Sequence, residues 1–360
     1  MQFIKETNIN FVGIKKVAFA VSFALIAISI ISLIVHKGPR YGVDFSGGSA
    51  VQIKFEGPVT INAVKKGLKP AGLAGASVQR FGNKSDNEFQ IRSKKTFASD
   101  SNFGSKVKSA MLDATGVTVR DLSLDMVGPQ VSKDLRQKAL LAMFYALLFI
   151  IIYISGRFEL KWGLSGILAA ILGGAVYGVT QLQNIAIVSS GMPILIITAL
   201  VISIFFCWKL ELKYAMGAIV ALLHDVTLTV GIFSILGIEF TLPIVAALLT
   251  IIGYSLNDSI VIMDRIRENR GKLSYASKAV INQSITETIS RTVITSGTTL
   301  LAVLILYVYG GQGVRAFSFA LLAGVLVGTY SSIAVAAPLV WSRKKDVSKS
   351  TAEELEVPEG

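Results

Sequence analysis

Long apolar stretches dominate this chain and limit what it can fold into. Each is about as long as the helix needed to span the hydrocarbon core of a bilayer. Eight such runs lie at residues 17–35, 138–155, 163–183, 187–208, 214–237, 240–263, 293–309 and 316–341. The mean hydropathy of +0.61 is well above that of a soluble domain. The sequence therefore predicts a polytopic α-helical membrane protein with about eight spans.

Lys and Arg residues fall in every second connection between these runs. They cluster in the N-terminal segment and near residues 157–161, 209–213, 265–278 and 343–345, whereas the intervening loops carry only Glu239 and Arg315. Connections rich in Lys and Arg remain in the cytoplasm. Both termini are therefore predicted to be cytoplasmic, with residues 1–37 forming the N-terminus and first transmembrane helix, and residues 342–360 forming a tail. The net charge of +12 partly reflects this topology, and no nucleic-acid partner is predicted.

One polar segment, residues 38–137, interrupts the apolar runs. Strand-like alternation occurs at 48–56, 76–82, 87–93 and 117–124, and helical spacing occurs at 58–72 and 101–114. The order β-α-β-β-α-β is that of a ferredoxin-like unit. We therefore expect an extracytoplasmic α+β domain at 38–137, followed by a transmembrane bundle at 138–341.

Several kinds of chemistry have no residues to support them in the sequence. The two histidines, His36 and His224, lie far apart, and no phosphate-binding loop of the GxxxxGK[ST] type occurs. The single cysteine, Cys207, cannot form an internal disulfide. We predict no metal, no cofactor and no enzymatic activity.

Two carboxylates lie inside apolar runs. Asp225 falls near the middle of its run and Asp258 lies deep in the next. A charge at the bilayer centre costs roughly 2.5 to 3.5 kcal/mol, so such residues usually meet a partner or a water-filled cavity. Arg291, at the start of the following run, is a candidate partner for Asp258, and Asn257 adds an amide to the same region. The spacings Gly174–Gly178 and Gly324–Gly328 predict close helix contacts.

Structural readings remain open for each of these polar residues. Arg291 is also placed to anchor its helix at lipid phosphates. Asp258 is either a proton-relay residue or one member of a structural pair, and the same two roles are open for Asp225. The functions that follow are a proton-coupled transporter or a non-transporting scaffold.

Several motifs resemble the SecF family of the bacterial protein-export machinery, whose members work with SecD. They are YGVDFSGGSAVQIKF (41–55), VGPQVSKDL (127–135), AMGAIVALLHDVTLTVGIFS (215–234), VAALLTIIGYSLNDSIVIMDRIREN (245–269) and SRTVITSGTTLLAVLILYVYGG (290–311). The resemblance implies a bundle related to the resistance-nodulation-division (RND) exporters, located in the bacterial cytoplasmic (inner) membrane. It also implies that the proton motive force assists export of unfolded polypeptides. The implied partners are SecD, the SecYEG channel, YajC, YidC and membrane lipids.

The resemblance also assigns roles to individual residues. It implies that Asp258 takes up and releases protons, with Arg291 as its charge partner, Asn257 beside it, and Asp225 as a second intramembrane acid. Asp44, Gly47 and Gly48 are implied to form the junction between the first span and the soluble domain. An alternative within the same superfamily is a proton-coupled exporter subunit for small molecules or lipids.

The chain departs from the family's six spans in one region. RFELKWGLSGILAA (157–170) is echoed 52 residues later by KLELKYAMGAIVAL (209–222). We interpret residues 157–208 as an insertion of two spans. Two added spans restore the original side of the membrane and leave the downstream topology unchanged.

Overall fold

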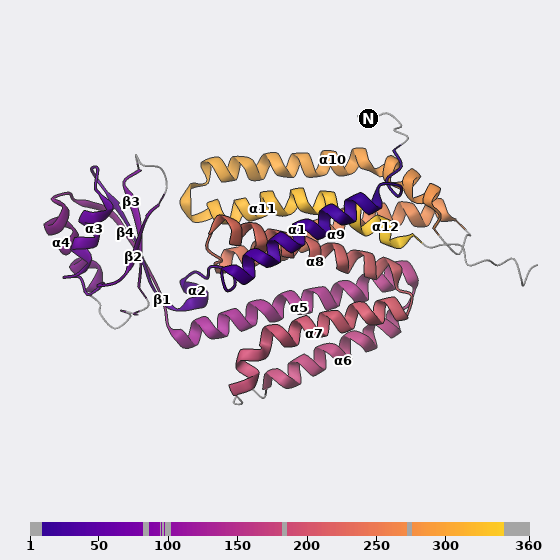
Figure 1. Cartoon of the computed structure of the whole chain (residues 1–360), viewed down its shortest axis with the longest axis horizontal. Coiled ribbons are helices and arrows are strands. Elements are labelled where there is room, and N and C mark those ends of the chain that lie inside the picture. Colours follow the sequence, from indigo (N-terminus) through magenta and orange to yellow (C-terminus); the bar gives the residue numbers. More distant parts are fainter. Residues whose placement is uncertain are drawn as a thin grey trace, which may run out of the picture.

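A small sheet domain lies at one end of a long bundle of helices in the computed structural model (Figure 1). The structure describes residues 9–81, 86–93, 95, 97, 102–181, 186–271 and 276–341. The predicted tail at 342–360 lies outside these residues.

The sheet domain has the predicted β-α-β-β-α-β order. Its elements are β1 (Gly48–Phe55), α3 (Ile61–Leu68), β2 (Ser77–Phe81), β3 (Glu88–Ser93), α4 (Phe103–Thr115) and β4 (Val119–Val127). The strands pair in the antiparallel order β2-β3-β1-β4. Alternate residues of β1, such as Val51 and Ile53, pack with Val64 of α3 and Val107 of α4 in one core. This arrangement confirms the expected ferredoxin-like domain.

The rest of the described chain is almost entirely helical. Its elements are α1 (Lys15–Val35), α2 (Val43–Ser46), α5 (Pro129–Glu159), α6 (Trp162–Gln181), α7 (Ala186–Lys209), α8 (Lys213–Leu236), α9 (Leu242–Arg270), α10 (Lys278–Tyr309), α11 (Gly311–Ser331), a π-helical turn (Ser332–Ala336) and α12 (Ala337–Val340). Seven helices in the described residues are long and apolar enough to cross a membrane. The predicted eighth span coincides with α7, whose apolar part is described from Ile196 to Lys209.

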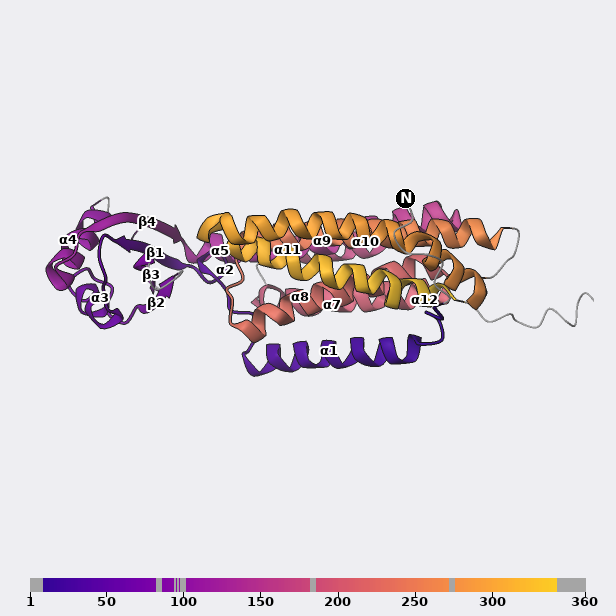
Figure 2. The ribbon, with the colours of Figure 1, turned by 90° about the horizontal axis from the view of Figure 1, so that it is seen from above.

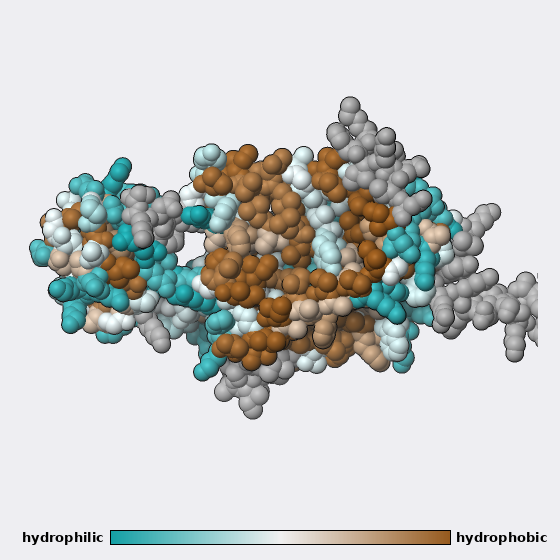
Figure 3. Space-filling model, turned by 45° about the horizontal axis from the view of Figure 1, so that its top comes forward, coloured by the Kyte–Doolittle hydropathy of each residue, from teal (hydrophilic) through white to brown (hydrophobic). Residues whose placement is uncertain are grey.

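The outside of the bundle has the character of a lipid-facing surface. Figure 3 shows a broad apolar band over the helices and hydrophilic residues over the sheet domain and the opposite end. Large apolar side chains such as Phe23, Phe149 and Ile305 are exposed in this region. Helix α1 lies along one side of the bundle, next to α8 (Figure 2). So much exposed apolar surface is typical of a membrane protein rather than a soluble one.

Several helices extend beyond the apolar runs that predicted them. Helix α5 begins at Pro129, nine residues before the predicted start at 138, because proline suits the first turn of a helix. Helix α9 continues through its charged end to Arg270, and α10 begins at Lys278 after Ser277, whose side chain accepts a hydrogen bond from the Val280 amide. The apolar runs give the membrane-spanning part of each helix and not its full length.

The two helices of the predicted insertion lie at the edge of the bundle. Helices α6 and α7 form a hairpin beside α5, away from α10 and α11 (Figure 1). Among the described residues the predicted contact at Gly174 and Gly178 does not occur, because a Cβ atom at either position would meet none of their atoms within 4 Å.

Candidate functional site

Asp225 is fully buried on α8 and has three polar partners. Its Oδ1 atom lies 2.9 Å from Nδ1 of His224. Its Oδ2 atom accepts hydrogen bonds from Ser255 Oγ of α9 at 2.6 Å and Ser331 Oγ of α11 at 2.8 Å. The Asp225 side chain, which is 0% exposed, therefore links α8, α9 and α11 by hydrogen bonds.

Asp258 lies on α9 and is 2% exposed. Its Oδ2 atom accepts one hydrogen bond, from Ser296 Oγ of α10, at 3.2 Å. Thr329 Oγ1 of α11 lies 2.7 Å from the same Ser296 hydroxyl. Asp258 is thus nearly as buried as Asp225, but among the described residues it accepts a single, longer hydrogen bond.

The two acid sites are neighbours on the same helices. Ser255, which binds Asp225, is three residues before Asp258, so both lie on one face of α9. Gly328 lets α11 approach this face, because a Cβ atom there would lie 2.9 Å from Cβ of Ser255 and 3.5 Å from Oδ2 of Asp225. A Cβ atom at Gly324 would collide with Ile251 of α9. The predicted close contact at Gly324–Gly328 is therefore confirmed.

Arg291 and Asn257 are not brought into this site. Both are exposed, and neither side chain makes a hydrogen bond or ion pair with either acid among the described residues. Helical geometry explains the placement, since consecutive residues are about 100° apart around the axis. Asn257 therefore turns away from Asp258, and Arg291 lies on a different face of α10 from Ser296.

The predicted junction residues connect the sheet domain to α9, the helix that carries Asp258. Oδ2 of Asp44 accepts a hydrogen bond of 2.8 Å from the backbone amide of Leu242, the first residue of α9. An acidic side chain at this position satisfies a free helix amide and complements the helix dipole. Gly47 and Gly48 have φ of +71° and +117°, which glycine adopts readily. The backbone can therefore turn sharply from α2 into β1.

Two further contacts reinforce this junction. Tyr41 and Phe240 form a parallel β-bridge, in which the Gly42 amide donates to the Phe240 carbonyl at 2.9 Å. Glu239, in the loop before α9, forms ion pairs with Arg92 of β3 and, at 3.9 Å, with Arg40. The loop between α8 and α9 is thus bound both to the α1–α2 connection and to the sheet.

Sequence reasoning missed several of these residues. Ser255, Ser331 and Thr329 lie in transmembrane helices, where serine and threonine hydroxyls commonly bond to a carbonyl of the preceding turn and do not mark a site. The three-residue spacing between Ser255 and Asp258 places Ser255 on the face of Asp258, and this spacing can be read from the sequence. For Glu239, the sequence shows only that it is the single acid in its loop.

Within the described part of the chain, no group of three or more His, Cys, Asp or Glu side chains could hold a metal ion. The polar groups of the two acid sites are carboxylates, hydroxyls and one imidazole from helices α8 to α11. Such groups can accept and donate protons inside a membrane. The fold and site therefore define a polytopic membrane protein with buried acids in its bundle and a sheet domain attached to the same helices.

Comparison with known proteins specifies the family. The family of protein export membrane proteins SecD/SecF, C-terminal region, matches residues 107–185 and 179–346, and the SecD/SecF GG motif matches residues 32–59. The chain is 39% identical to the protein translocase subunit SecF of Magnetococcus marinus, over 98% of each chain. It is 37% identical to that of Desulfurispirillum indicum, over 92% of this chain and 90% of the relative. The chain belongs to the SecD/SecF family, as one of its SecF members.

A solved structure agrees with this assignment. The crystal structure of SecDF from Thermus thermophilus, a translocon-associated membrane protein, matches with a TM-score of 0.65 and 29% identity. The match covers 94% of this chain but 39% of that one. The similarity supports the expected RND-like bundle, and this chain corresponds to less than half of the longer protein.

Proposed function

We propose that this chain assists protein export across the bacterial cytoplasmic membrane by using the proton motive force. Family membership supports the export role. The observation that carries the proton role is the environment of Asp258, a buried carboxylate of α9 whose one hydrogen bond among the described residues is a long one, from Ser296 of α10. A buried ionisable group in a membrane bundle normally has a functional task.

The proposed orientation rests on where the basic loops lie. The connections at 157–161 and 209–213, and the described residues 265–271 and 276–278, fall at the end of the bundle opposite the sheet domain (Figure 1). Basic connections remain on the cytoplasmic side. Both termini would then be cytoplasmic, and the sheet domain at 38–137 would face the outside, where an emerging unfolded polypeptide is found.

The proposed cycle begins with the charge of Asp258. When it is ionised, a single hydroxyl compensates it poorly, and Arg291 is a nearby cation that can approach by a rotation of α10. Protonation removes this attraction and allows α9, α10 and α11 to shift. A membrane potential supplies about 2.3 kcal/mol per charge per 100 mV. Because about 1.4 kcal/mol is a tenfold change in an equilibrium, one proton can bias two states substantially.

The junction would carry this shift to the sheet domain. Asp44 holds the first residue of α9, and Glu239 links the loop before α9 to Arg92 of the sheet. Movement of α9 along or around its axis would therefore pull on both the α1–α2 connection and β3. We assign Asp44, Gly47 and Gly48 to this mechanical link, and Asp225 with its three partners to holding α8, α9 and α11 together.

The partners follow from the family and remain part of the proposal. SecD would supply the rest of the membrane assembly, and the SecYEG channel would supply the translocating chain. YajC, YidC and surrounding lipids complete the proposed set. The α6–α7 hairpin is the proposed two-span insertion at 157–208, and it packs against α5 and α8 at the edge of the bundle.

The experiment is potential-driven export into inverted vesicles that contain this chain and its SecD partner. Asp258→Asn keeps the shape of the side chain but cannot ionise, and Asn257→Ala is the matched control on the exposed face. We expect Asp258→Asn to assemble normally and lose the proton-dependent part of export, while Asn257→Ala exports normally. Normal export by Asp258→Asn at equal assembly would favour a scaffold, and loss of small-molecule efflux with export intact would favour an exporter.

A further inference from the structure

The buried face of α10 carries four hydroxyl groups at a strict four-residue spacing. They are Ser284, Thr288, Thr292 and Ser296, with exposures of 0%, 8%, 1% and 3%. Residues four apart lie on one helix face, and each step advances about 6 Å along the axis. We call these four residues the hydroxyl ladder. It extends along the side of α10 that faces the bundle interior.

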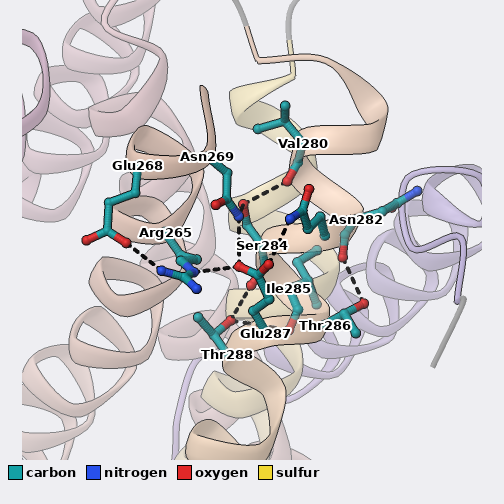
Figure 4. Close-up of polar contacts among 11 residues, drawn as sticks. Arg265, Glu268, Asn269, Val280, Asn282, Ser284, Ile285, Thr286, Glu287 and Thr288 are labelled. Atoms are coloured by element: carbon teal, nitrogen blue, oxygen red, sulfur yellow. Dashed lines mark hydrogen bonds and ion pairs between the residues drawn. The ribbon is translucent and has the colours of Figure 1, made fainter. Parts of the chain in front are cut away.

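Each end of the hydroxyl ladder meets ionisable groups. At one end, Ser296 donates to Asp258. At the other end, Ser284 Oγ accepts a hydrogen bond of 3.0 Å from Asn269 Nδ2 of α9, which also lies 2.9 Å from Glu287 Oε2. Glu287 in turn pairs with Arg265 at 2.5 Å, and Arg265 pairs with Glu268 at 2.8 Å (Figure 4).

We call Arg265, Glu268, Asn269 and Glu287 the terminal cluster, and three of these side chains are accessible to solvent. The side chains of Arg265, Glu268 and Glu287 are 42%, 61% and 30% exposed, at the end of the bundle away from the sheet domain. The hydroxyl ladder therefore connects a carboxylate that is buried in the bundle with carboxylates that face solvent. The distance between the two ends is three helical steps, or about 18 Å.

Thr292, in the middle of the ladder, is the residue that points to a ligand. The other three hydroxyls of the ladder have partners: Ser284 donates to the Val280 carbonyl at 2.7 Å, Thr288 to the Ser284 carbonyl at 2.8 Å, and Ser296 to Asp258. The Thr292 hydroxyl has no hydrogen-bond partner among the described residues, although it is 1% exposed. A buried hydroxyl normally finds a partner, and where the protein offers none a water molecule fills the role.

The spacing of the ladder suits single waters. A water between two hydroxyls spans two hydrogen bonds of about 2.8 Å each, close to the helical step of about 6 Å. Thr292 can therefore share one water with Thr288 and another with Ser296. A row of small side chains also allows close helix packing, but packing alone does not account for a buried hydroxyl without a partner.

We propose that the hydroxyl ladder is the route by which protons pass between Asp258 and the terminal cluster. This proposal rests on the proposed function of Asp258. Each hydroxyl or water accepts one proton and releases another, so the ladder itself is unchanged after a transfer. The net event is the movement of one proton from the Asp258 carboxyl group to Glu287 or to bulk water, with no other bond made or broken.

The test uses three variants of α10 in vesicles that contain this chain and its SecD partner. Thr292→Val keeps the side-chain shape and removes the hydroxyl, whereas Thr292→Ser keeps the hydroxyl and removes the methyl group. Thr298→Val makes the same chemical change on an exposed face of the helix. Proton flux is followed with an internal pH-sensitive dye, and assembly and thermal stability are measured on the same preparations.

We expect Thr292→Val to lower proton flux by about tenfold or more at normal assembly, because proton transfer depends on a positioned donor and acceptor. Thr292→Ser and Thr298→Val should conduct like the wild type. Wild-type flux in Thr292→Val would overturn the proposal. Equal loss in Thr292→Val and Thr292→Ser would also overturn it, since the methyl group and its packing would then be what matters.

A parallel Asp258→Asn sample separates this proposal from the proposed function. If Asp258→Asn loses proton flux while Thr292→Val keeps it, Asp258 carries protons by another route and only the hydroxyl ladder is rejected. If Asp258→Asn keeps full flux, the proposed function fails and the ladder has no proton to carry.

Discussion

Asp225 and Asp258 are two buried carboxylates on neighbouring helices with different surroundings. Asp225 has three polar partners at 2.6 to 2.9 Å, from its own helix and two others. Asp258 has one hydrogen-bond partner in the part of the chain that the structure describes, at 3.2 Å. Their exposures of 0% and 2% are nearly the same. Burial alone therefore does not distinguish them, and the number of hydrogen bonds does.

This difference indicates which acid can change its charge during a working cycle. A carboxylate whose partners come from several helices binds those helices together, and changing its charge disturbs all of them at once. A carboxylate with one partner can change state at a smaller structural cost. We therefore assign the structural task to Asp225 and the exchange of protons to Asp258, and each prediction below tests that division.

The largest effect is expected from Asp225→Ala. The substitution leaves His224, Ser255 and Ser331 without their common partner in a fully buried site. Removing one side of a buried charged network costs about 3 to 5 kcal/mol. We expect a loss of that order in the unfolding free energy measured in mild detergent. Asp258→Ala should lose about 1 to 2 kcal/mol, and an equal loss in the two variants would remove the distinction.

The serine partners of the two acids should differ in the same way, with Ser296 affecting proton coupling and Ser331 affecting stability. Ser296→Ala removes the hydrogen bond of Asp258, and a contribution of about 1 kcal/mol corresponds to about a fivefold lower rate of proton-dependent export. Ser331→Ala should cost a similar amount of stability but leave the proton-dependent fraction of export unchanged. The measurement is export with and without an imposed potential, at matched protein levels. A larger coupling defect in Ser331→Ala would contradict the assignment.

Asp44→Ala tests whether α9 needs its cap at the junction. The loss of a helix cap costs about 1 kcal/mol. Because Asp44 holds the helix of Asp258, we expect weaker proton-dependent export, with recovery in Asp44→Asn, which can still accept the hydrogen bond from Leu242. Asp121→Ala, at an exposed position of β4, is the control. Failure of Asp44→Asn to recover would show that the negative charge is needed rather than the cap.

The smallest effect is expected at Asn257. Its side chain is exposed and has no hydrogen bond to Asp258 among the described residues. Asn257→Ala should change stability by less than about 0.5 kcal/mol, as exposed substitutions usually do. Thermal unfolding and export by the same vesicles check this. A large export defect would place Asn257 at a contact with the partner subunit.

The sequence predicted the architecture well because the architecture follows from periodicity. Alternation in GSAVQIKF and helical spacing around Val64 and Val107 were sufficient for the order of the sheet domain. Length and hydropathy were sufficient for the spans. These signals depend on which residue types recur and not on how helices are rotated against one another.

The site was harder to predict because it depends on that rotation. Proximity in sequence suggested Asn257, but adjacent helical residues point in different directions. Charge suggested Arg291, yet a hydroxyl, that of Ser296, contacts Asp258. Ser331 reaches Asp225 across 106 residues of sequence, and only the close approach of α11 at Gly328 brings it there. Helix packing of this kind leaves little trace in one sequence.

The most direct test of the division between the two acids is pH-difference infrared spectroscopy of the chain with its SecD partner in lipid. Protonation of a carboxylate produces a carbonyl band, and the other Asp and Glu residues of the chain, which number 23 in all with Asp225 and Asp258, give a background that is common to every variant. We predict that the band of a buried carboxyl group, seen above this background on acidification, is present in the wild type and in Asp225→Asn but missing in Asp258→Asn. Loss of the band in Asp225→Asn, with the band retained in Asp258→Asn, would contradict the account.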